Sequence, residues 1–456
     1  MDNPYILILP FFLLLLFATL VDFKLIFLSI FLLLPTSMEL SLPGGFGTDF
    51  PSEPLMIYLM FAGFCYFGAN FKKIDRGFFN HTLTKLILAH LMWIGISALM
   101  SQIFFISFKF FLAKTWYVTV FIFLTGLFIK SPDDFKKAFW CLLLSLMGVT
   151  LITLAKHSAY GFSFETINKT TWPFFRNHVN YGVMLTLLMP FALLVRKWYR
   201  FGSLARFVIN LGIFIFFVGI LFAYTRAAYI SLLLIPIGYF LFHYKWTKMA
   251  ITAGLVTMTM SVSYLIIGNN YLNFAPDFNK TIYHANFEDH LEATLALQDL
   301  STMERVYRWI AGANMSTEHV LTGFGPGTFT HFYKSYTSTL FQTYVSDNED
   351  DSTVHNYFLL TLIEQGWPGF LVFMVLCIFV FIKGEQIYHE TQDPQRKQLV
   401  MACLICLLMI MANIFMADLM ETDEIGSLFF INIALLINQD LYNKRHNNQV
   451  LELEND

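Results

Sequence analysis

Charged side chains are scarce in this chain, and their scarcity excludes a soluble globular protein. Asp, Glu, Lys and Arg make up 13% of the 456 residues, whereas a soluble domain carries about 25%. Hydrophobic residues make up 56% and include 52 phenylalanines. They gather in runs of roughly 15 to 22, which can cross a hydrocarbon layer about 30 Å thick. The composition predicts an all-α protein, a polytopic transmembrane helical bundle of about 12–13 spans.

Cysteine is also rare, and its placement argues against covalent or redox chemistry. All five cysteines lie inside apolar segments: Cys65, Cys141, Cys377, Cys403 and Cys406. None lies in the long polar loop, so no disulfide framework is implied. Cys403 and Cys406 form a CxxC, but its position within an apolar helix favours packing over metal binding or redox work.

Several motifs of metal-dependent enzymes are missing. The sequence has no Walker motif, no HExxH and no DxD-like carboxylate pair clearly placed outside the membrane. The acidic run 347–351 is interpreted as a solvated loop rather than a calcium site. Glu364 and Asp418 are isolated carboxylates near membrane helices, and we interpret both as groups that support structure or support other site residues. The sequence therefore favours a mechanism without a metal ion and without a cofactor.

Apolar segments and basic connections together predict the topology. Thirteen segments are candidate spans, and the first two could instead form one broken span: 5–20, 23–34, 54–70, 83–104, 116–129, 138–154, 181–194, 208–224, 227–241, 249–267, 367–382, 399–416 and 425–437. Basic connections alternate with connections poor in Lys and Arg, and the positive-inside rule places the basic set in the cytoplasm. These connections are 71–76, 130–137, 196–200, 243–248 and 383–397, with the tail at 443–446 on the same side.

Four regions follow from this topology. Transmembrane helices occupy 1–267, with a short external loop near 155–180; a large extracytoplasmic loop occupies 268–357; further transmembrane helices occupy 358–440, and a cytoplasmic tail occupies 441–456. The N-terminus lacks the basic start and cleavage site of a signal peptide, so we expect Tyr5 onward to remain in the membrane. The large loop holds eleven Asp and Glu against four Lys and Arg. Because it is too long for a connector and contains helix signals, we expect a small, mainly helical cap.

Helix signals in the large loop place several candidate residues. Ser301 to Glu304 fit a capping box, in which the two side chains bond to each other's backbone N–H. The helix that follows would carry Arg305 and Trp309 on one face, since they lie four residues apart. Arg308 would lie on a different face. The helix should end near 322–327, where the glycines of a GxGxG, with Gly325 at its centre, predict a tight turn before they predict a phosphate cradle.

A second helix signal begins at Ser352 and predicts His355 in the first turn of a helix that enters the membrane, followed by Asn356. The positive end of the helix dipole disfavours an imidazolium there. A neutral histidine at the membrane surface can accept a proton, and a surface or capping role is equally open.

Three further polar residues stand beside apolar spans. Arg226 lies between two apolar runs with almost no loop, and a charge at the membrane edge usually has a partner or a ligand. Arg176 and His178 lie in the shorter external loop and either line the same cavity or sit at the interface. Arginine forks match phosphate oxygens, so a cluster of external arginines and a histidine suits an anionic, lipid-linked substrate whose pyrophosphate leaving group must be neutralised.

These motifs, in this order, resemble the O-antigen ligase and O-antigen polymerase superfamily of bacterial envelope enzymes. The resemblance rests on Thr225–Arg226 at a span junction, Arg305-x-x-x-Trp309, the glycine-rich 323–329, His355–Asn356 and Glu364-x-Gly366-x-x-Gly369. It covers roughly 175–382.

The resemblance implies a metal-independent, inverting glycosyltransferase of the bacterial inner membrane, with its active site on the periplasmic face. Its donor would be a glycan linked to undecaprenyl pyrophosphate, and its acceptor a glycan or the lipid A core. Arg226 and Arg305 would hold the pyrophosphate, and His355 would activate the acceptor hydroxyl. Membrane lipids are its expected surroundings, and no nucleic acid is expected as a partner.

Three alternatives remain open within and beyond this family. A ligase is favoured, with a repeat-unit polymerase and a protein O-oligosaccharyltransferase as other family activities. A flippase for lipid-linked glycans would show charges deep in several helices and pseudo-symmetric halves. Here the charges lie at span ends on one side, and no second copy of the Arg or His motif is found, which favours chemistry at a surface over transport.

Overall fold

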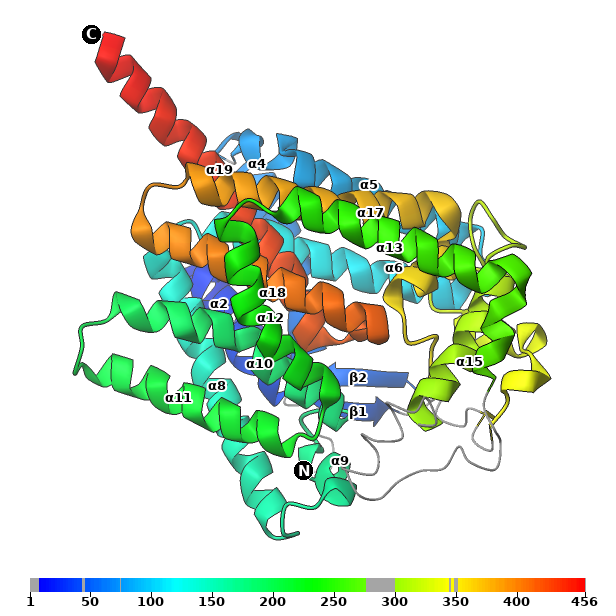
Figure 1. Ribbon diagram of the computed structural model, residues 1–456. Coiled ribbons are helices and arrows are strands. Elements are labelled where there is room, and N and C mark those ends of the chain that lie inside the picture. The colour runs from blue at the N-terminus through cyan, green and yellow to red at the C-terminus, as the bar shows by residue number, and fades with distance from the viewer. Residues whose placement is uncertain are drawn as a thin grey trace.

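The computed structural model describes residues 8–42, 46–73, 75–275, 300–343, 346–347 and 352–455, and it is a helical bundle (Figure 1). The long helices are α1 (Ile8–Val21), α2 (Phe23–Leu33), α3 (Ser52–Ala69), α5 (Thr82–Leu99), α6 (Phe104–Tyr117), α8 (Pro132–Ser158), α10 (His178–Val195), α11 (Leu204–Phe222), α12 (Arg226–His243), α13 (Thr247–Ile266), α17 (Tyr357–Glu390), α18 (Pro394–Met416) and α19 (Asp423–Asn455). Helix α6 continues through a π-helical stretch, η4 (Val118–Leu124), into α7 (Thr125–Phe128).

Further elements lie between these helices. The α-helical ones are α4 (Arg76–Asn80), α9 (Ile167–Thr171), α15 (Leu300–Met315) and α16 (Phe329–Phe332). The 3-10 helices are η2 (Leu34–Thr36), η3 (Phe71–Lys73), η5 (Phe164–Thr166), η6 (Arg196–Trp198), η7 (Ile267–Phe274), η8 (Tyr333–Tyr336), η9 (Thr339–Phe341) and η10 (Leu419–Glu421). Two strands, β1 (Met38–Leu42) and β2 (Phe46–Phe50), form an antiparallel hairpin.

The polytopic helical fold is confirmed. In the described part of the chain, ten helices are long and apolar enough to cross a membrane, and two shorter apolar helices precede them. Each of the thirteen predicted spans falls on a helix. The predicted boundary at Phe104 was wrong, because α5 ends at Leu99 and α6 already begins at Phe104. Helix α17 begins ten residues before the predicted span, and Gly366 kinks it with a positive φ without ending it.

Contacts between connections define the two ends of the bundle. At one end, which we call the basic end, Arg396 donates to the carbonyl of Lys130 at 3.3 Å, and Trp198 donates to Gln398 at 2.7 Å. Lys24, at the start of α2, pairs with Asp134 at the start of α8. The opposite end carries the β1–β2 hairpin and α15, away from the C-terminal end of α19 (Figure 1). We call it the outer end. The basic connections 130–137, 196–200 and 383–397 thus lie at the same end of the bundle.

Helix α18 forms the centre of the bundle. It packs against α10, α12, α17 and α19. From Val400 to Leu407 every side chain is at most 2% exposed, and Cys403 and Cys406 lie in this stretch. A helix that is apolar on all sides is typical of a protein core or of a membrane span, and here other helices enclose it. Its two ends are therefore held in place by the whole bundle.

Candidate functional site

The outer end of α18 carries a carboxylate that contacts a predicted site histidine. Asp418 follows the last residue of α18 by two positions, and its Oδ1 lies 3.4 Å from Nδ1 of His355. The hydroxyl of Thr353 donates to the other carboxylate oxygen. Burial raises the pKa of Asp418, but the hydrogen bonds from His355 and Thr353 and the charge of His355 outweigh it and bring the pKa below its usual value. Asp418 is therefore an anion at neutral pH, directed at the imidazole.

The backbone places His355 before the helix and not within it, so the predicted first-turn position was wrong. His355 has φ +53, a left-handed conformation that is uncommon for a residue with a side chain. Asn356 is the N-cap of α17, and its side-chain oxygen accepts from the N–H of Leu359 at 3.0 Å. Asn356 is buried, whereas the His355 side chain is 30% exposed. The cap thus fixes the helix start and leaves the imidazole at the surface.

Helix α15 packs against the same end of α18. The ring of Trp309 meets that of Phe415 edge-on, with centroids 6.3 Å apart. Arg305 lies one turn earlier on the same face of α15. In the described part of the chain the indole N–H of Trp309 has no hydrogen-bond partner. The structure thus brings Arg305 and Trp309 to the end of the bundle that carries His355.

Arg308 lies on the inner face of α15. It is 6% exposed and donates to Glu304 at 3.3 Å. Glu304 also accepts from Ser346 at 2.6 Å and from Thr343. The predicted capping box is wrong, because α15 already includes Leu300, and the Glu304 carboxylate binds these loop residues and Arg308 instead of the helix start.

Arg226 begins α12 at the outer end of the bundle. The turn before it contains Tyr224 with φ +50, and the hydroxyl of Thr225 donates to the carbonyl of His178 at 3.1 Å. A methyl group added at Gly182 would lie 3.2–3.3 Å from side-chain atoms of this turn and its flanks. The absence of a side chain at Gly182 therefore lets the turn approach α10 closely.

A buried polar contact ties α12 to α18 just inside the site. The amide of Asn413 donates to the hydroxyl of Ser231 at 2.7 Å. Ser231 lies five residues after Arg226, and Asn413 lies five residues before Asp418. The start of α12 and the end of α18 consequently lie at the same level in the bundle. Arg226 and Asp418 are therefore both at the outer end.

Arg176 and His178 lie in the segment that leads into α10. Arg176 forms an ion pair with Glu39 of β1 at 2.8 Å, and its side chain is 71% exposed. The hydrogen bond with Glu39 raises the pKa of Arg176, and the negative charge of Asp418 adds to the effect. His178 Nδ1 lies 2.6 Å from the side-chain oxygen of Asn168. The structure thus places both residues at the outer end, with Arg176 in the electrostatic field of Asp418.

The glycine-rich turn is bonded to the protein itself. Gly325 has φ +110, and its N–H donates to the carbonyl of Glu364 at 3.0 Å. The Glu364 carboxylate accepts from the N–H groups of Gly327 at 2.8 Å and Phe329 at 3.0 Å. A Cβ at Gly325 would lie 2.1 Å from the hydroxyl oxygen of Ser101. These N–H groups are occupied, so the geometry corresponds to the tight turn and not to a phosphate cradle.

The sequence did not reveal the hydroxyls that hold this turn or the partner of His355. Ser97 donates to the carbonyls of Thr322 and Glu364 at 2.5 and 2.9 Å. Asp418 had been interpreted as a supporting carboxylate, but nothing in the sequence linked it to His355. Its only signal is a carboxylate directly after an apolar span. In the described residues no group of three or more His, Cys, Asp and Glu could hold a metal ion.

A comparison with protein-family models finds a match, which covers the middle of the chain. Residues 211–374 match the family model described as O-antigen ligase. This segment runs from α11 to the first half of α17 and includes Arg226, Arg305 and His355. No curated protein sequence matches the chain. The match supports membership of the O-antigen ligase superfamily for residues 211–374.

Proposed function

We propose that this protein is a membrane glycosyltransferase that moves a glycan from an undecaprenyl-pyrophosphate donor to an acceptor hydroxyl, with the lipid A core as the favoured acceptor. The transfer is inverting and needs no metal ion. It takes place at the outer end of the bundle, on the periplasmic face of the bacterial inner membrane. The observation that carries this proposal is the contact of His355 with Asp418 at the outer end of α18, where the chain also gathers several arginines.

His355 is the general base. Because Nδ1 faces the Asp418 carboxylate, it carries the proton of that contact, and Nε2 is left as the acceptor nitrogen. A carboxylate on one nitrogen holds the ring in the tautomer and orientation that the other nitrogen needs. The acceptor oxygen forms a bond to the anomeric carbon, its proton passes to Nε2, and the bond to the phosphate oxygen breaks with its electron pair. A single displacement of this kind inverts the anomeric carbon.

Arg226 and Arg305 stabilise the leaving pyrophosphate. Arg226 occupies the first position of α12, where the positive end of the helix dipole also faces an anion. Arg305 comes from α15, on the face that reaches the end of α18 through Trp309. Two fixed guanidinium groups from different elements can bind the two phosphates of one pyrophosphate through paired hydrogen bonds. The charge that they neutralise grows as the bond breaks, so they act mainly on the transition state.

Some of the remaining predicted residues contact the substrate, and the others hold the site in place. The partly buried ring of Trp309 packs against a sugar ring of the glycan, and exposed Arg176, with His178 next to the Arg226 turn, completes the rim. Arg308, buried against Glu304, holds α15 to the loop, and Asn356 caps the helix behind the base. The N–H of Gly325 is occupied by α17, so this glycine positions the turn and does not bind substrate.

The test is transfer in vitro. Purified protein is incubated with an undecaprenyl-pyrophosphate glycan and candidate acceptors in the presence of EDTA. Arg226→Ala, Arg305→Ala and His355→Ala should each abolish product, whereas Arg200→Ala, an exposed arginine at the basic end, should not. Activity that survives in all three site variants would refute the site. One added glycan on the acceptor identifies a ligase, a ladder of repeat units identifies a polymerase, and donor moved across a bilayer without product identifies a flippase.

A further inference from the structure

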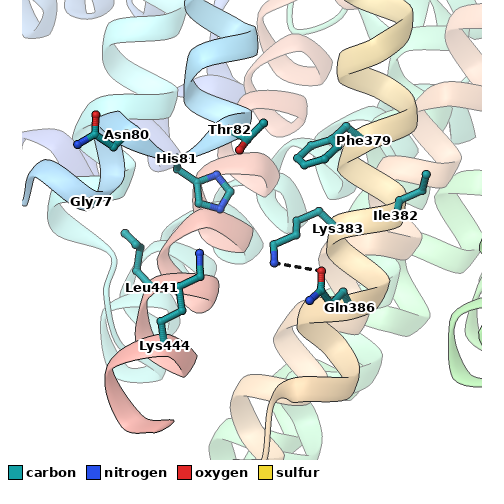
Figure 2. A pocket seen from close by; sticks show the side chains of 10 residues that line it. All are labelled: Gly77, Asn80, His81, Thr82, Phe379, Ile382, Lys383, Gln386, Leu441 and Lys444. Carbon is teal, nitrogen blue, oxygen red and sulfur yellow. Dashed lines mark hydrogen bonds between the residues drawn. The ribbon is translucent and has the colours of Figure 1, made fainter. Parts of the chain in front are cut away.

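A polar cavity lies at the basic end of the bundle, at the opposite end from the proposed active site. Its volume is about 480 Å³, and it opens between the start of α5, the second half of α17 and the second half of α19. Figure 2 shows the side chains of His81, Lys383 and Lys444 directed into it from these three helices. The other polar groups that line it are Asn80, Thr82 and Gln386. The cavity thus collects hydrogen-bond donors from separate elements.

The charge of this cavity is positive. Asp440, fully buried behind it, lies 2.7 Å from the ammonium of Lys444, 3.0 Å from that of Lys383 and 3.2 Å from Nε2 of His81. One carboxylate therefore faces two ammonium groups and an imidazole. Two full positive charges against one negative charge leave an excess of one, even with His81 neutral. The Asp440 anion holds the lysines in place while their remaining N–H groups face the cavity.

The start of α5 adds to this potential. His81 is its N-cap and accepts from the N–H of Leu83 at 3.2 Å, so the imidazole is fixed at the helix start. Helix α5 has 18 residues, and its positive dipole end lies beside Thr82 at the cavity wall. Lys383 also donates to Gln386 at 3.2 Å, which holds its ammonium at the rim (Figure 2). The positive groups are thus preorganised, and an anion would meet them without rearrangement.

Apolar groups at the mouth of the cavity indicate which anion it takes. Phe379 and Ile382 on α17 and Leu441 on α19 line it beside the lysines. Helices α5 and α17 are bonded toward their outer ends, where Trp93 donates to the carbonyl of Gln365 at 2.8 Å. At the basic end the cavity lies between them. A lining of this kind, in which apolar side chains adjoin lysines, matches a phosphate head group with acyl chains along the helices.

We propose that this cavity binds the phosphodiester head group of an anionic phospholipid from the leaflet at the basic end, through Lys383, Lys444 and the start of α5. This site is separate from the glycosyl-transfer site and does not depend on the proposed function. Basic pockets between membrane helices on the cytoplasmic side are known to suit such head groups. The positive-inside orientation places the basic end in that leaflet.

Native mass spectrometry of the full-length protein in detergent tests the proposal. Phosphatidylglycerol and phosphatidylcholine are titrated in parallel against the wild type, Lys444→Gln, Lys444→Arg and the matched control Lys248→Gln. The Lys444 side chain is 60% exposed, and Asp440 keeps two other partners after its removal, so this variant should remain folded. Lys248 is exposed at the basic end outside the cavity.

We expect phosphatidylglycerol to bind the wild type more tightly than phosphatidylcholine does. Lys444→Gln should weaken the affinity for phosphatidylglycerol roughly fivefold, whereas Lys444→Arg and Lys248→Gln should change this affinity little. An equal loss of phosphatidylglycerol affinity in Lys444→Gln and Lys248→Gln would overturn the proposal, because lipid binding would then depend only on the total charge of the protein. A parallel melting experiment adds inorganic phosphate. Protection by phosphate equal to that by phosphatidylglycerol would overturn the assignment to a lipid.

Discussion

Replacing Asp418 by Asn tests the base assignment most directly. The substitution keeps the shape of the side chain and removes its charge, 3.4 Å from the imidazole of His355. In the ground state the neutral imidazole loses little electrostatic stabilisation when this charge is removed. In the transition state the ring takes up the acceptor proton and becomes a cation, and the carboxylate then stabilises it.

The size of this effect follows from the geometry. Two unit charges about 4 Å apart near a protein surface interact by about 4 kcal/mol. The His355 and Asp418 side chains are 30% and 22% exposed, so solvent screens part of this energy. We therefore assign about 2–3 kcal/mol to the pair in the transition state, which corresponds to a loss of roughly 30- to 150-fold in kcat. KM should change little, because the charge that Asp418 stabilises is absent from the bound ground state.

The assay is steady-state transfer with a fluorescent acceptor, measured for the wild type, Asp418→Asn and Asp133→Asn. Asp133 is a control at the basic end with a side chain that is 82% exposed. Melting curves establish that each variant is folded. A wild-type kcat in Asp418→Asn would refute the role of the pair. A rise in KM at constant kcat would show instead that Asp418 acts in binding.

Four further outcomes follow from the contacts described above. Gly366→Ala should yield little folded protein by size-exclusion chromatography, since φ is +68 and its Cβ would lie 2.3 Å from the carbonyl oxygen of Leu321. Glu364→Gln should lower the free energy of unfolding by roughly 2 kcal/mol in denaturant titrations, because the carboxylate accepts two backbone N–H groups. Gly182→Ala should reduce transfer about tenfold with a nearly unchanged melting temperature, since a displaced Arg226 turn misplaces the donor. The lowered pKa of Asp418 means that its contribution to stability is present above about pH 4 and is lost as pH falls, so melting temperatures of the wild type and Asp418→Asn should converge in acid.

Local patterns in the sequence were sufficient for the bundle. Apolar runs and alternating basic connections reflect transfer into lipid, which acts on each segment separately. They located every long helix except α6, which lies almost entirely between two predicted spans. The hairpin of β1 and β2 was not foreseen, because its segment carries a weak alternation next to much stronger apolar runs. The position of His355 was also missed. His355 is a left-handed residue before an N-cap, and its partner Asp418 lies 63 residues further along the chain, so neither feature leaves a local pattern.

The site could be predicted only in part for the same reason. Spacing of four residues placed Arg305 and Trp309 together, and it separated them from Arg308. The same spacing places Arg308 beside Glu304, but it could not show that the pair is buried, because Glu304 also binds Thr343 and Ser346, which lie 39 and 42 positions after it. Nor could the spacing show that the Glu364 carboxylate accepts hydrogen bonds from the N–H groups of the glycine-rich turn. Partners brought together by the packing of distant helices leave no periodic signal in one sequence.

The enclosed middle of α18 divides the site into a fixed half and an adaptable half. Asp418 follows α18, a helix that four other helices surround, so its position is as stable as the bundle itself. Arg305 and Trp309 belong to α15, which contacts the outer end of α18 through the rings of Trp309 and Phe415. In the proposed transfer, glycans of different bulk would be accommodated by repacking α15, while Asp418, the partner of the proposed base His355, keeps its position. Divergence of substrate preference between relatives should accordingly accumulate in α15 and its neighbours and spare α18.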